Sequence, residues 1–170
     1  MQLGLISLKA GQAEEAVKWL ENVKFVPEQV NRARLHLAQV AYQKQDYERA
    51  IRCLSGAGFL DSVSDAALKS DLCLILGLSE RNRKEPDLKK AGEYLKLVVP
   101  NSAGYAQAQA ALGDQYREAQ AYAQAVAAYT QASATPKYAA QGLFHLGAIH
   151  VKWAEQAADP AFHILLLAFF

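Results

Sequence analysis

A large apolar residue followed at once by a small residue recurs along the chain at intervals of 34, 39, 36 and 34 residues. The recurring pairs are Leu3-Gly4, Leu37-Ala38, Leu76-Gly77, Leu112-Gly113 and Leu146-Gly147. Such a period is typical of stacked repeats, in which each unit buries its apolar face against its neighbours. We therefore predict one solenoid over 1–170. Its repeats are expected at approximately 1–27, 28–64, 65–102, 103–136 and 137–170, the last of them degenerate.

A second set of apolar and small positions follows each pair after a fixed interval. In the fourth repeat these positions are Ala125, Tyr129 and Ala132, which are four and three residues apart. This spacing places them on one face of a helix, with small residues where two helices come close. Each repeat is therefore predicted to be a hairpin of two antiparallel helices, and nothing in the sequence indicates a strand. The predicted fold class is all-α.

The helix boundaries follow from the apolar period and from the prolines and glycines between periodic segments. The expected helices cover 1–10, 12–24, 28–44, 46–55, 65–82, 87–98, 103–118, 121–134 and 137–156, with a weaker helix over 160–169. The longest irregular connection lies around Gly56 and Gly58. We predict that the joint of the stack lies there.

Two segments resemble the tetratricopeptide repeat family, whose motif has about 34 residues. Residues 42–54, YQKQDYERAIRCL, are similar to the inter-helix turn and second helix of that motif. The fourth repeat matches the motif at Leu112, Gly113, Tyr116, Ala125, Tyr129, Ala132 and Pro136. The resemblance implies a right-handed superhelical solenoid of four to five hairpins with a concave groove. The Ala- and Gln-rich style resembles bacterial members of the family that serve in secretion and cell-envelope assembly.

The resemblance also implies that the first helix of each hairpin lines the groove, where a peptide or helix of a partner protein would bind. The candidate groove residues are Leu35, Gln39, Tyr42, Gln43, Arg81, Asn82, Asp114, Arg117, Phe144 and Lys152. Family members that clamp acidic chaperone tails use asparagine at inward positions of the first two hairpins. Because Leu5 and Gln39 occupy those positions here, we expect no such carboxylate clamp.

Residue patterns that carry catalysis or metal binding are scarce. His145 and His150 are five residues apart, which turns them to different faces of a helix, and no second ligand pair accompanies them. The glycines occur singly and form no phosphate-binding loop. We therefore expect a non-enzymatic protein without a metal or cofactor.

Charge and cysteine content narrow the choice of partner further. The chain has 18 basic and 17 acidic residues and a formal charge of +1, too balanced for a domain that binds nucleic acid through phosphate contacts. Basic residues near position 85 are interrupted by Glu80, Glu85 and Asp87, which predicts a solvated hairpin tip. Cys53 and Cys73 are expected to be packed thiols, with a disulfide or a reactive thiol as the alternative.

The two ends of the sequence are expected to be cut from a longer protein. The apolar tail from Phe162 to Phe170 is too short for a membrane-spanning helix, which needs about 20 residues. Three interpretations of this tail stay open: a degenerate helix packed under 137–156, a dimer or partner contact, or a membrane-touching or non-native end. No secretion signal is visible, and both the cytoplasm and the bacterial periplasm or envelope stay open as compartments.

Two hypotheses for function follow. The first is a scaffold that binds a partner peptide or helix in the concave groove as part of a larger assembly. The alternative is a structural spacer that self-associates, possible as a homodimer through the apolar tail.

Overall fold

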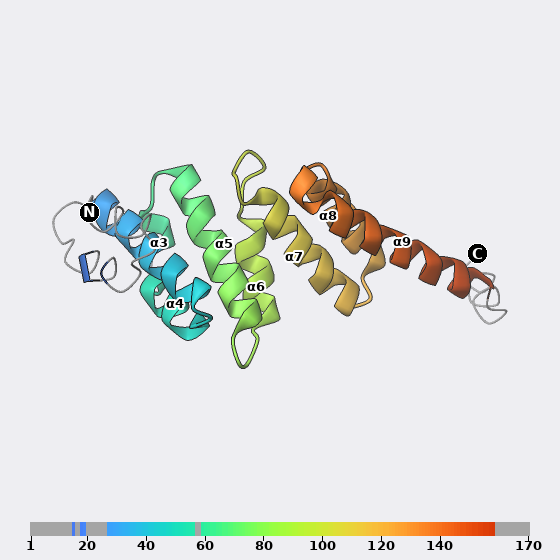
Figure 1. The fold of residues 1–170 in the computed structure, drawn as a ribbon, viewed down its shortest axis with the longest axis horizontal. Helices are drawn as coiled ribbons and strands as arrows, with labels where there is room; N and C mark the ends of the chain where they lie inside the picture. Colours follow the sequence, from blue (N-terminus) through green and yellow to red (C-terminus); the bar gives the residue numbers. More distant parts are fainter. Residues whose placement is uncertain (1–14, 16–17, 20–26, 57–58, 159–170) are drawn as a thin grey trace. The chain divides into compact units, whose positions relative to one another are not determined.

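A computed structural model describes residues 15, 18–19, 27–56 and 59–158, and this part of the chain is helical throughout, without a strand (Figure 1). The all-α prediction is confirmed for these residues. The helices are α3 (Pro27–Gln43), α4 (Tyr47–Leu54), α5 (Ala66–Asn82), α6 (Leu88–Lys96), α7 (Tyr105–Glu118), α8 (Tyr122–Ser133) and α9 (Pro136–Ala158), with a short 3-10 helix η1 (Leu60–Ser62). The expected helices over 1–24 and 160–169 lie outside the described residues, apart from 15 and 18–19.

Aspartates fix the starts of three helices. The side chain of Asp46 accepts a hydrogen bond from Arg49 N at the start of α4, and Asp87 accepts one from Lys90 N at the start of α6. Asp65 accepts hydrogen bonds from two backbone amides at the start of α5. Each carboxylate satisfies amides that have no partner within the helix and lies at its positive end.

Two turns between consecutive helices share one geometry. Gln45 after α3 and Gln120 after α7 have φ angles of 61° and 57°, in the left-handed region. In each turn the left-handed residue donates a backbone hydrogen bond to the carbonyl three positions earlier. The following residue donates to the carbonyl five positions earlier. This is the Schellman arrangement that ends helices, and its recurrence after 75 residues supports a repeated hairpin.

Helices α5 and α6 show how a hairpin closes (Figure 1). The backbone N–H of Asp87 donates to the carbonyl of Glu80 near the tip, and Val99 N donates to Ser70 Oγ at the far end. Because contacts pair earlier residues of α5 with later residues after the tip, the two helices run antiparallel. At the centre, a Cβ on Gly77 would lie 2.6 Å from Leu95 Cγ. Glycine is therefore required where the two helices touch.

The chain divides into two compact units, residues 1–108 and residues 109–170, with the boundary inside α7. The expected joint near Gly56 is wrong, because α4 and α5 on either side of that connection pack together within the first unit. They share one apolar core with α3, formed by Leu35, Ala38, Ala41, Ala50, Leu54, Phe59, Val63, Leu68, Leu72, Ile75 and Leu76. The prediction of a single solenoid over 1–170 stays a prediction.

Both cysteines are free and belong to the packed interior of the first unit. Cys73 is fully buried, and Cys53 is half-buried against the core. Burial raises the pKa of the Cys73 thiol, because the thiolate would lose its hydration there. The expectation of packed thiols is confirmed.

The second unit is built around Tyr129 of α8, whose side chain has no exposed surface. Its ring occupies the space that a side chain on Gly113 of α7 would need, with ring atoms 2.7 Å from a Cβ placed there. On α9, the close contact falls at Gly142, which faces Ser133 and the carbonyl of Tyr129. It does not fall at Gly147, where an added Cβ meets nothing within 4 Å in the described part of the chain. The expected small-residue contact of the fifth Leu-Gly pair is thus displaced by five residues.

The replacement Gly113→Leu tests this packing. We expect it to lower the free energy of unfolding by about 1–3 kcal/mol, because the new side chain must displace the buried Tyr129 ring. Urea denaturation followed by circular dichroism measures the change. The matched control is Gly147→Leu, which enters open space; equal losses for the two variants would contradict the assigned helix contact.

A second prediction concerns the left-handed turn residue. The replacement Gln120→Gly is expected to stabilise the protein by about 0.5–1 kcal/mol, because relief of left-handed strain exceeds the extra entropy that glycine gains on unfolding. The control Gln124→Gly, inside α8, is expected to destabilise by about 0.5–1 kcal/mol, since glycine weakens a helix interior. Thermal melts of both variants provide the measurement, and a shift of the same sign in both would refute the turn assignment.

Candidate functional site

The predicted groove residues of the first unit lie on α3 and α5. At one end of these helices, Arg32 Nη2 is 3.3 Å from Asp65 Oδ2. At the other end, Asn82 Nδ2 donates to Tyr42 Oη over 3.3 Å. The two contacts pair the start of α3 with the start of α5, and the end with the end. Hence α3 and α5 lie parallel and side by side, although their residues are 33 to 40 positions apart in sequence.

Five of the candidate residues share this surface, which we call the α3/α5 face: Gln39, Tyr42, Gln43, Arg81 and Asn82. Gln43 and Asn82 are exposed. Tyr42 is half-buried, packs against the core and meets the ring of Tyr47 edge-on, with 5.5 Å between ring centroids. Gln39 Oε1 is 3.1 Å from His36 Nδ1. The face therefore combines exposed amides with a tyrosine that is fixed by its packing.

Leu35 does not belong to this face. Only 5% of its surface is exposed, and it is part of the core of the first unit. It lies three residues before Ala38 and therefore shares the buried side of α3. The expectation that Leu35 lines a groove is wrong for this reason.

In the second unit, two of the candidate residues hold a buried tyrosine. Tyr129 Oη donates a 2.6 Å hydrogen bond to Asp114 Oδ1, and Arg117 Nε donates to Tyr129 Oη over 3.4 Å. His145 stacks on the Tyr129 ring at 4.9 Å between centroids, and its Nε2 is 3.7 Å from Asp114 Oδ1. Asp114 and Arg117 are thus engaged inside the protein, while the last two candidates, Phe144 and Lys152, are exposed on α9.

This network changes the acidity of its members. Burial and the hydrogen bond to the Asp114 carboxylate raise the pKa of Tyr129 well above its usual value of 10.0, because both penalise the phenolate. The hydrogen bond to Tyr129 also raises the pKa of Arg117. The tyrosine therefore stays protonated and keeps donating to Asp114 over the whole neutral range.

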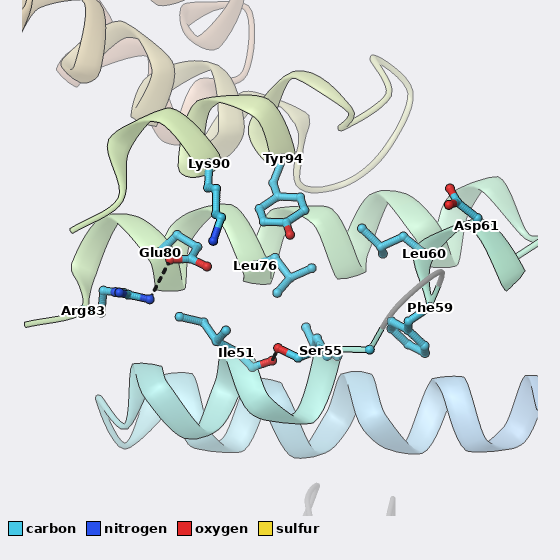
Figure 2. A pocket seen from close by; sticks show the side chains of 12 residues that line it. Ile51, Ser55, Phe59, Leu60, Asp61, Leu76, Glu80, Arg83, Lys90 and Tyr94 are labelled. Carbon is cyan, nitrogen blue, oxygen red and sulfur yellow. Dashed lines mark hydrogen bonds and ion pairs between the residues drawn. The ribbon is translucent and has the colours of Figure 1, made fainter. Parts of the chain in front are cut away.

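A pocket of about 480 Å³ lies on other surfaces of the first unit (Figure 2). Helices α4, α5 and α6 contribute its walls, together with the connection between α4 and α5, and we call it the α4–α6 pocket. Its lining residues are Ile51, Leu54, Ser55, Gly56, Phe59, Leu60, Asp61, Leu76, Glu80, Arg83, Lys90 and Tyr94. None of the candidate groove residues is among them.

One part of the pocket is apolar. Leu54, Phe59 and Leu76 are buried members of the core, so their pocket surfaces are the edge of that core. Ile51 and Leu60 are half-buried beside them. The site is therefore an opening into the core of the first unit.

The other part carries charges that pair with one another. The side chain of Glu80 is 5% exposed, and its Oε2 accepts a 3.1 Å hydrogen bond from Arg83 Nη1. Arg83 Nε donates to the carbonyl of Glu85 over 2.7 Å and lies 3.7 Å from Glu48 Oε1. Thus the guanidinium holds a buried carboxylate in place and links α4 to the end of α5. The prediction of a solvated hairpin tip is wrong for Glu80.

Tyr94 separates the two parts of the pocket. Its side chain extends from α6 toward Leu76 (Figure 2). Burial and the nearby charge of Glu80 raise the pKa of its hydroxyl, which is therefore a proton donor at neutral pH. Within the described residues no hydrogen bond satisfies this hydroxyl.

The sequence analysis missed this pocket, although one signal was present. In α5, Glu80 directly follows an unbroken stretch of buried residues from Leu72 to Ser79. An acid on a helix that is buried all round needs a counter-charge nearby, and Arg83 stands three positions later. Which other elements complete the pocket depends on the connection after α4, whose course no residue pattern indicates.

No family model, curated protein or solved structure matches this chain. Among the described residues, no three histidine, cysteine or acidic side chains lie close enough together to hold a metal ion. Nor does any helix in this part of the chain combine the length and apolarity needed to cross a membrane. A functional interpretation therefore depends on the two surfaces and the network described above.

The network around Tyr129 gives a testable prediction. We expect Tyr129→Phe to lower the free energy of unfolding by about 1–3 kcal/mol, because the partly buried Asp114 carboxylate loses its 2.6 Å donor. The control Tyr122→Phe, on the same core but without a hydroxyl hydrogen bond among the described residues, is expected to change it little.

The same pair reports on pH. Since the pKa of Tyr129 is raised in the folded state, its contribution is complete below the unfolded pKa near 10 and is lost as the pH rises above it. Urea denaturation at increasing pH should therefore show the difference between wild type and Tyr129→Phe shrinking above about pH 10. A difference that grows with pH would refute the assigned hydrogen bond.

Proposed function

We propose that this chain is a non-enzymatic scaffold of tetratricopeptide-like hairpins that binds a peptide or helix of a partner protein as part of a larger assembly. The binding surface is the α3/α5 face. The observation that carries this proposal is the contact between Asn82 and Tyr42, which joins two parallel helices 40 residues apart into one surface.

Three further features support the proposal. The Schellman turns at Gln45 and Gln120 repeat one hairpin geometry, as a solenoid requires. Close helix contacts at Gly77 and Gly113 fall on the small residues of the repeated Leu-Gly pairs. The exposed amide of Gln43 can accept and donate hydrogen bonds to a peptide backbone beside the rigid ring of Tyr42.

Self-association is the second candidate, and α9 provides the observation that favours it. Leu143, Phe144 and Val151 are 63%, 74% and 59% exposed, although each is a large apolar residue. They lie on adjoining parts of the helix surface, as positions three, four or seven residues apart do. Exposed apolar patches of this kind mark interaction surfaces.

Photo-crosslinking in cells of the source organism distinguishes the two candidates. A photoreactive amino acid replaces Gln43 on the α3/α5 face, Phe144 on α9, or the exposed Gln124 of α8 as the matched control. We expect position 43 to capture a defined partner protein that position 124 does not capture. Equal capture at positions 43 and 124 would overturn the proposal, and a covalent homodimer from position 144 alone would favour self-association.

A further inference from the structure

The α4–α6 pocket is large enough for more than one side chain. Its volume is about 480 Å³, within the range of roughly 300–1,000 Å³ that is usual for ligand sites. A buried cavity of roughly 150 Å³ already accommodates benzene. An aromatic or branched aliphatic side chain would therefore leave room for the main chain on either side of it.

The charges in the pocket favour an uncharged ligand. Every charged lining residue already has a partner of opposite sign within 4.0 Å: Asp61 with Lys69, Glu80 and Glu48 with Arg83, and Lys90 with Asp87. A charged ligand would have to break one of these pairs and give up its own hydration. An apolar group instead covers the exposed edge of the core at Ile51, Phe59 and Leu76, and the pairs stay intact.

A polar group of the pocket is still available. The hydroxyl of Tyr94 has no hydrogen-bond partner in the described part of the chain, and its side chain points toward Leu76 at the apolar part (Figure 2). A partly buried hydroxyl gains from a partner that reaches it. A peptide carbonyl next to an apolar side chain supplies such an acceptor without a net charge.

We propose that the α4–α6 pocket binds an extended peptide by one large, uncharged apolar side chain, while a main-chain carbonyl of that peptide accepts a hydrogen bond from Tyr94. The peptide is a segment of a partner protein, and in this respect the inference rests on the proposed scaffold function. The pocket would act as a second anchoring site, since its lining shares no residue with the α3/α5 face.

The test is an NMR titration of the ¹⁵N-labelled full chain with acetyl-Gly-Gly-Phe-Gly-Gly-amide. Two matched probes carry glutamate or lysine in place of the phenylalanine. We expect saturable shifts of the backbone amides of Ile51, Phe59 and Tyr94 with the phenylalanine probe, and about tenfold weaker binding of both charged probes. Equal or tighter binding of a charged probe, or shifts that do not include these amides, overturns the proposal.

Gly56→Phe closes the pocket without straining the backbone. A Cβ at Gly56 would have only an ordinary contact, 3.6 Å from Phe59 Cβ, so a side chain can be added there. The variant is expected to lose the shifts, whereas Gly147→Phe, an identical replacement outside the pocket, keeps them. Tyr94→Phe is expected to weaken binding about fivefold through loss of one hydrogen bond. Unchanged binding by Gly56→Phe refutes the assignment of the pocket.

The two proposals fail separately. The titration uses purified protein and a synthetic probe, so a negative result removes the pocket as a peptide site whatever position 43 captures in cells. Conversely, a position 43 that captures no partner removes the scaffold proposal, while probe binding at Ile51, Phe59 and Tyr94 would still stand as a property of the pocket.

Discussion

The close approach of paired helices is the constraint on which the rest of the structure depends. A large side chain from one helix fills the space left by glycine on its neighbour, as Leu95 does at Gly77 and Tyr129 does at Gly113. Interiors at crystal-like density leave no room for an additional methyl group at such points. The helix separation fixed there also sets the height of each element above the core, and so determines which side chains reach a surface.

Polar groups at the helix ends convert this packing into specific sites. The carboxylates of Asp65 and Asp87 fix where α5 and α6 begin, which places Glu80 and Lys90 on adjoining walls. Arg83, immediately after α5, then neutralises the buried Glu80. In the second unit Asp114 performs the corresponding role for a hydroxyl, because it accepts the hydrogen bond of the fully buried Tyr129.

Much of the helical architecture could be predicted from sequence, because contacts between helices repeat with the chain. The Leu-Gly pairs located Gly77 and Gly113 correctly, and the amphipathic period gave α3 to α9 to within about three residues. Leu35 was misplaced because one period cannot define how wide the buried side of a helix is. The α4–α6 pocket was missed for a different reason. It depends on the course of the connection through Phe59 and on a single ion pair, neither of which recurs between repeats.

The matching turns at Gln45 and Gln120 have a consequence for how such a chain can change length. In each, the chain leaves one helix in the left-handed region and enters the next with the same two backbone hydrogen bonds. Removal or duplication of the 75 residues between them would join ends of one local geometry, so no new turn would have to form. Recombination at these points can therefore add or remove whole pairs of hairpins, while each remaining helix keeps its own termination signal.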